Sequence, residues 1–219
     1  DSDNEEGDED TDLMLTLLEC CLSRSTLEEI EFDYDISLVP IPLLVSAVST
    51  LKAVSFGHSA RLKNSQMVKI LEECPNLINL VAPQRKNLNN KSARLIAHIT
   101  TQVTKLDLTS SDIVPKHMKH ILTKCLQSTT LKDLNLERID LSNVPSILLA
   151  NVCTQLQKVN LRATHLNTEQ ISTILNVCSR SRTLKSIDFT YNAMERVPIN
   201  LLTALVPKLE TVKMKKSLN

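Results

Sequence analysis

The sequence predicts an α/β solenoid in which short strands alternate with helices. Two observations indicate this fold: an apolar strand template recurs along the chain, and an amphipathic helix pattern alternates with it. A regular period of this kind is typical of stacked units that bury their apolar faces against one another. The composition is a third observation that agrees with this fold: aromatic residues make up only 2% of the chain, and there are two Gly. The core must therefore be filled by Leu, Ile and Val, in a fold with few tight turns.

The strand template has apolar residues at positions 1, 4 and 6, as in Leu156, Val159 and Leu161 of "LQKVNLRATHL". It occurs eight times, and successive copies are 24 to 28 residues apart. Alternation of this kind predicts a half-buried strand. The other copies are Leu27-Ile30-Phe32, Leu51-Val54-Phe56, Leu77-Leu80-Ala82, Val103-Leu106-Leu108, Leu131-Leu134-Leu136, Leu184-Ile187-Phe189 and Leu209-Val212-Met214.

A second pattern predicts the helices, with apolar residues at i, i+3, i+4 and i+7. The pattern is clear in "MLTLLECC", "MVKILEEC", "MKHILTKC" and "ISTILNVC". It is weaker in "SILLANVC". Local signals mark two helix starts. Asn167 followed by Gln170 resembles a capping box, and Pro115 suits the first turn of a helix.

Together these repeats resemble those of leucine-rich repeat proteins of the longer, helix-containing class typified by ribonuclease inhibitor. Related repeats occur in NOD-like receptors and in F-box leucine-rich repeat proteins. The resemblance implies a horseshoe of about eight repeats over residues 13–219, with a concave parallel sheet and convex helices. Template positions 2, 3, 5, 7 and 8 would then face the concavity. That family usually has Asn or Cys at position 9. Here Asn192 fits and Ser111 and Thr164 fit in modified form, whereas Ile139, Ser59 and Arg85 depart from it.

Residues 1–12 differ from the rest of the chain, because they carry eight acidic residues and no basic one. We expect them to form a solvated, disordered tail or linker, with an interaction or regulatory segment as the alternative. Ser2 is then a candidate phosphorylation site. The remaining residues carry 17 acidic and 25 basic side chains. Since the chain begins at Asp1, we expect it to be part of a longer polypeptide, and without a long apolar run we expect no membrane span.

Candidate chemistry is sparse. Five cysteines occupy the same slot at the end of a helix pattern, namely Cys21, Cys74, Cys125, Cys153 and Cys178. That slot suits a buried thiol acting as a small apolar side chain, which predicts an intracellular location, cytoplasmic or nuclear. His117 and His120 are three residues apart among lysines, which favours a solvated basic face over a metal site. Without a catalytic or phosphate-binding motif, we expect no enzyme, cofactor or metal.

The polar template positions are the candidate binding residues. They run from acidic in the first strand to net basic in the last, a polarity that would orient a charged partner. Tyr34, Arg162 and Tyr191 are the best anchors, because Tyr and Arg are enriched among interface hot spots. The predicted concave-face set is Glu29, Glu31, Asp33, Tyr34, Lys105, Asp107, Asn135, Glu137, Arg138, Lys158, Asn160, Arg162, Lys185, Asp188, Tyr191 and Lys213.

These features predict a non-catalytic protein–protein interaction module, a scaffold or adaptor, with a protein partner of unknown identity. The scarcity of aromatic residues for base stacking argues against nucleic acid. Two alternatives stay open. One is the substrate-recognition repeat domain of a ubiquitin ligase, and the other is the sensor or autoinhibitory repeat domain of a NOD-like receptor.

Overall fold

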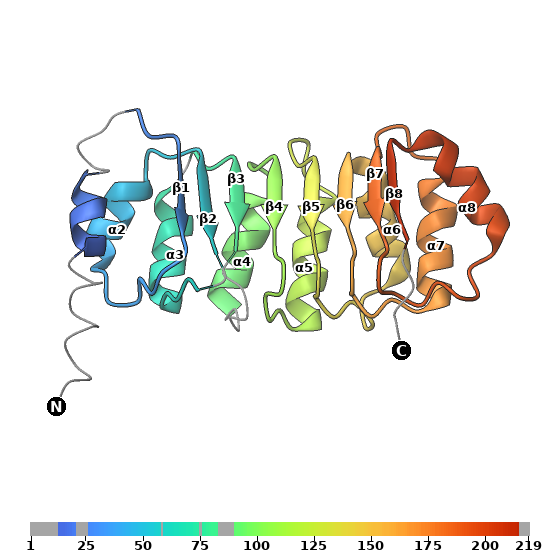
Figure 1. Ribbon diagram of the computed structural model, residues 1–219, viewed down its shortest axis with the longest axis horizontal. Coiled ribbons are helices and arrows are strands. Elements are labelled where there is room, and N and C mark those ends of the chain that lie inside the picture. Colours follow the sequence, from blue (N-terminus) through green and yellow to red (C-terminus); the bar gives the residue numbers. More distant parts are fainter. Residues whose placement is uncertain (1–12, 21–25, 58, 75, 83–89, 215–219) are drawn as a thin grey trace.

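The computed structural model describes residues 13–20, 26–57, 59–74, 76–82 and 90–214. In these residues, eight strands form one open parallel sheet whose spatial order follows the chain, and helices alternate with the strands (Figure 1). The predicted α/β solenoid is confirmed. The predicted acidic tail, residues 1–12, lies outside the described residues.

The strands are short, with three or four residues each. They are β1 (Glu29–Phe32), β2 (Ala53–Phe56), β3 (Asn79–Val81), β4 (Lys105–Asp107), β5 (Asp133–Asn135), β6 (Lys158–Asn160), β7 (Ser186–Asp188) and β8 (Thr211–Lys213). The helices are residues 13–20, α2 (Ile41–Val48), α3 (Asn64–Glu73), α4 (Asn90–Ile99), α5 (Pro115–Cys125), α6 (Ser146–Gln155), α7 (Thr168–Cys178) and α8 (Ile199–Leu205), with the 3₁₀ helix η1 (Val206–Lys208) after α8.

Every strand pairs with the next in the same template register. Position 4 of each strand therefore lies beside position 4 of its neighbour, as in Leu106 beside Leu134 and Leu134 beside Val159. In the six inner strands the side chains at this position are buried, whereas Ile30 of β1 and Val212 of β8 are only half-buried. The apolar template thus forms one continuous core between the sheet and the helices, and that core is less covered at its two ends.

The helices begin where the sequence signals indicate. Asn167 accepts a hydrogen bond from the backbone N–H of Gln170, and Gln170 Oε1 accepts one from the backbone N–H of Asn167, which confirms the capping box. Pro115 is the first residue of α5. Proline also stands just before α2, α6 and α8, at Pro40, Pro145 and Pro198. A fixed φ and a missing N–H cost little there, because the first helical N–H groups have no intrahelical partner.

The turns that follow β4 to β7 share one construction. In each, the Asp or Asn at position 5 accepts a hydrogen bond from the backbone N–H two residues later, with N···O distances of 2.8 to 3.1 Å. The residue at position 8 then adopts a left-handed φ of 52 to 62° without being glycine. A short polar side chain thus ends the strand and closes the turn. The four position-5 residues are Asp107, Asn135, Asn160 and Asp188; the four position-8 residues are Ser110, Arg138, Ala163 and Tyr191.

The first two strands end differently. The rings of Phe32 and Phe56 stack with centroids 5.8 Å apart. After the strands, Asp33 Oδ1 accepts a hydrogen bond from the backbone N–H of Ser59. Gly57 passes so close to Asp33 that a Cβ at Gly57 would lie 2.3 Å from the carboxylate oxygen. A side chain at position 57 would therefore displace the Asp33 carboxylate, which favours glycine at this turn.

At position 9, Asn192 gives the β7 repeat an internal polar anchor. Asn192 is buried, and its Oδ1 accepts hydrogen bonds from the backbone N–H groups of Thr164 and Leu166 in the preceding repeat. Its Nδ2 donates to the carbonyl oxygens of Leu161 and Phe189. Ser111, Ile139 and Thr164 are buried at the same position, whereas Ser59 is exposed and Arg85 lies outside the described residues.

Candidate binding face

The candidate site is the face of the sheet turned away from the helices, which we call the exposed sheet face. It is formed by the strand side chains at template positions 3 and 5 and by the turn residues at positions 7 and 8. In β4 to β8 it carries Lys105, Asp107, Asp133, Asn135, Lys158, Asn160, Ser186, Asp188 and Lys213, and most of these line a shallow depression of about 210 Å³. Most of the predicted set therefore lies on one surface, because the in-register sheet aligns equal template positions.

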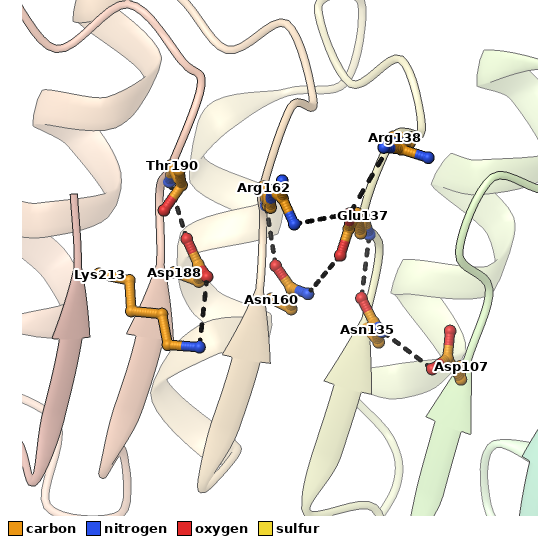
Figure 2. Close-up of polar contacts among 9 residues, drawn as sticks. All are labelled: Asp107, Asn135, Glu137, Arg138, Asn160, Arg162, Asp188, Thr190 and Lys213. Atoms are coloured by element: carbon orange, nitrogen blue, oxygen red, sulfur yellow. Dashed lines mark hydrogen bonds and ion pairs between the residues drawn. The ribbon is translucent and has the colours of Figure 1, made fainter. Parts of the chain in front are cut away.

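Side chains on this face are connected across strands (Figure 2). Asn135 Nδ2 donates to Asp107 Oδ2 at 2.8 Å, and Asn160 Nδ2 donates to Glu137 Oε2 at 3.2 Å. The same Asn side chains also accept the turn N–H groups through Oδ1. These amides therefore hold the turns in place as well as facing solvent. From the sequence, Asn135 and Asn160 were predicted only as partner-binding residues. The recurrence of Asp or Asn at position 5 could have indicated their second role in closing the turns.

Arg162 is the best-held charged residue of the face. Its Nη1 lies 3.3 Å from Glu137 Oε1, and its guanidinium carbon lies 4.9 Å from the centroid of the Tyr191 ring. Glu137 also approaches Arg138 Nε at 3.8 Å. The two predicted anchors, Arg162 and Tyr191, thus lie in contact, and a guanidinium held between a carboxylate and an aromatic face loses little side-chain freedom on binding.

Tyr34, the third predicted anchor, lies elsewhere. It lines a small hollow of about 50 Å³ with Leu13, Met14 and Leu17 of helix 13–20. Tyr34 comes from the first repeat and lacks the left-handed backbone that places Tyr191. The structure therefore separates Tyr34 from the Arg162–Tyr191 pair. Tyr34 and Tyr191 share template position 8, so the template did not predict this separation.

The charges of the face are more balanced than the sequence suggested. Lys158 approaches Asp133 at 3.8 Å, Lys185 approaches Glu210 at 3.0 Å, and Lys213 approaches Asp188 at 4.0 Å. In contrast, the exposed Glu29 and Glu31 of β1 have no ion pair among the described residues. Lys105 and Lys132 likewise have none there. Among the described residues, the charges without an ion pair are thus acidic at β1 and mixed near β4 and β5, where Asp107 lies with Lys105 and Lys132. Lys215 and Lys216 lie outside the described residues.

The thiols fill the core. Cys74, Cys125, Cys153 and Cys178 are buried, as the sequence predicted, while Cys20 is exposed and Cys21 lies outside the described residues. Burial raises the pKa of Cys74 to about 11 and that of Cys125 to about 12. A hydrogen bond with Cys178 and burial raise the pKa of Cys153. Cys74, Cys125 and Cys153 therefore stay protonated at neutral pH, a state in which a thiol is a poor nucleophile and a poor metal ligand.

Metal ligation has little support in the described part of the chain. No group of three or more His, Cys, Asp or Glu side chains gathers there in a way that could hold an ion. His120 is exposed, and His117 Nε2 lies 2.5 Å from Asn90 Oδ1 rather than beside a second histidine.

The fold and this face define an α/β solenoid built from strand–helix repeats. Searches with protein-family models and against curated proteins give no match. Among the described residues, no helix combines the length and apolar character needed to cross a bilayer.

Proposed function

We propose that this chain is a leucine-rich repeat domain of the ribonuclease-inhibitor-like class that binds a protein partner on its concave, exposed sheet face. The eight-fold template, its shared register and the position-9 Asn192 network support the class. We propose a scaffold or adaptor role without catalysis, and the raised pKa values of the buried Cys74, Cys125 and Cys153 support it, because protonated thiols are poor nucleophiles.

The Arg162–Tyr191 pair is the observation that carries the proposal. An arginine half-exposed between Glu137 and an aromatic ring is already oriented before a partner arrives. Arg and Tyr are the residue types that dominate binding free energy when water is excluded around them. Beside this pair, Asn135 Nδ2 donates to Asp107 Oδ2 and Asn160 Nδ2 donates to Glu137 Oε2, which connects neighbouring repeats of the face.

We place the domain inside the cell, in the cytoplasm or nucleus. Cys74, Cys125, Cys153 and Cys178 are free thiols buried in the core. Reducing compartments preserve such thiols.

Affinity purification from cell extract tests the binding proposal. We expect the double variant Arg162→Gln, Tyr191→Asn to recover at least about tenfold less partner than the unmodified chain, equal to about 1.4 kcal/mol of binding free energy. Asn is chosen because it tolerates the left-handed backbone of Tyr191, whose φ is 62°. Loss of the exposed Arg162–Glu137 pair lowers folding stability by less than about 1 kcal/mol.

The matched control is Lys119→Ala, on the exposed side of α5. It removes a surface charge without touching the exposed sheet face, so partner recovery should stay unchanged. Equal recovery by the double variant, combined with loss in the Lys119 variant, would move the binding site to the helices.

A further inference from the structure

The two ends of the solenoid are complementary halves of one repeat. In the inner repeats, each strand is followed by a helix and then by the next strand. At one end, helix 13–20 precedes β1, and Met14 and Leu18 of this helix belong to the common core. At the other end, β8 is the last described strand, and α8 is the last described α-helix (Figure 1). If β8 of a second copy lay before helix 13–20, then β8, this helix and β1 would follow the same strand–helix–strand order as the inner repeats.

Both ends expose apolar side chains. On helix 13–20 and beside it, Leu17 is 49% exposed and Tyr34 is 63% exposed. At the opposite end, Ile199 is 72% exposed and Val206 is 41% exposed, and together with Leu202 and Met214 they line an open apolar hollow of about 370 Å³. Apolar surface gathered at two defined places marks interaction sites more than scattered exposure does.

The outermost strands are matched in charge and register. If β8 of one copy continued the register of the sheet onto β1 of another, Lys213 would lie beside Glu31, and Val212 would lie beside Ile30. Within the chain, Lys213 already approaches Asp188, its partner in that same register, at 4.0 Å. The half-buried Val212 and Ile30 would gain the burial that their equivalents have in every inner strand.

We propose that copies of this chain associate head to tail, with β8 and α8 of one copy packed against β1 and helix 13–20 of the next. The contact reproduces the one between neighbouring repeats, with the backbone groups at the outer edges of β8 and β1 pairing across it. Because the two contacting surfaces differ, the assembly is heterologous and grows by addition of further copies. It uses the outer edges of the sheet at β1 and β8 and leaves the exposed sheet face of β4 to β7 free.

Sedimentation velocity of the 219-residue chain over a rising concentration series tests this proposal. We expect species of at least twice the 24.5 kDa chain mass to accumulate with concentration. We also expect added salt to reduce them, because Glu31 and Lys213 are exposed. A chain that stays monomeric at every concentration overturns the proposal.

Two end variants make the test specific. Leu17→Glu blocks one end and Val206→Glu blocks the other, so each variant alone should be monomeric. Mixed in equal amounts, the intact end of one should bind the intact end of the other and give a heterodimer that grows no further. A mixture that remains monomeric, or single variants that still assemble, contradicts the heterologous contact.

Charge variants provide a second pair that perturbs folding less. Glu31→Lys and Lys213→Glu should each weaken assembly about tenfold or more, because each places like charges across the contact. Their mixture should assemble again, since every contact between unlike variants then joins opposite charges at positions 31 and 213. A mixture that assembles no better than either variant alone contradicts the proposed register.

The matched control for these variants is Ile147→Glu. Ile147 is an exposed apolar residue of α6, in the middle of the solenoid, so this variant should assemble like the unmodified chain. Equal weakening by the control would show a general surface effect and overturn the proposal.

Discussion

The repeats of β4 to β7 and those of β1 and β2 end their strands by different means. In the later repeats, a side-chain oxygen at position 5 caps the turn, and a left-handed residue at position 8 follows it. In the first two repeats, position 5 is Glu31 and Ser55, neither of which makes such a cap in the structure. Instead, the stacked rings of Phe32 and Phe56 and an isolated parallel β-bridge between the backbones of Asp35 and Arg61 connect those repeats.

This difference distinguishes a regular region of the solenoid from a less regular one. Capped turns repeat the same backbone geometry, so the side chains beside them, including Arg162 and Tyr191, project from equivalent places. The first repeats lack that regularity, and β1 carries exposed carboxylates at the edge of the sheet. We therefore propose partner binding at the later repeats and end-to-end contact at the first and last ones.

The largest expected effect on stability comes from breaking the ring stack. Phe56→Ala should lower the free energy of unfolding by about 4 kcal/mol, because a fully buried ring is removed and a cavity is left. Hydrogen exchange should report lost protection first in β1 to β3, since repeat stability is shared mainly between neighbours.

Phe189→Ala is the matched control in the later region. Phe189 is buried at the same template position, but no ring contact accompanies it among the described residues. Urea denaturation should show that Phe56→Ala costs about 1 kcal/mol more than Phe189→Ala, the value of one aromatic pair. Equal costs would mean that ring stacking does not distinguish the two regions.

The next effect probes the polar anchor of the later repeats. Asn192→Ala should cost about 3 kcal/mol, because buried backbone groups of Thr164, Leu166 and Leu161 lose their partners. Ser59→Ala, at the same position of the second repeat but exposed, should change stability by less than about 0.5 kcal/mol. Chemical denaturation of both variants measures the difference, and similar losses would remove the distinction at position 9.

Much of the fold was readable from the sequence, because burial enforces a period. Leu106, Leu134 and Val159 had to be apolar to share one core, and the template found them. The capping box at Asn167 was equally readable, since its two side chains bond within one helical turn. Local geometry and core periodicity are therefore the parts that a single sequence expresses directly.

The site was only partly readable. The template placed Lys105, Asn160 and Lys213 on one face, but it could not show which charges neutralise each other across strands. The ion pair of Lys158 with Asp133 joins residues from neighbouring repeats, and so does the contact between Arg162 and Glu137. The left-handed turn at Tyr191 was also hidden, because a tyrosine there gives no glycine-like signal.

The measurement that tests the central claim most directly is site-specific photo-crosslinking of the partner. A photoreactive residue is placed at Lys158 on the exposed sheet face, or at Lys119 on α5 as the matched position. Binding at the exposed sheet face predicts a crosslinked partner from Lys158 and none from Lys119. A partner captured from Lys119 and not from Lys158 would contradict the account.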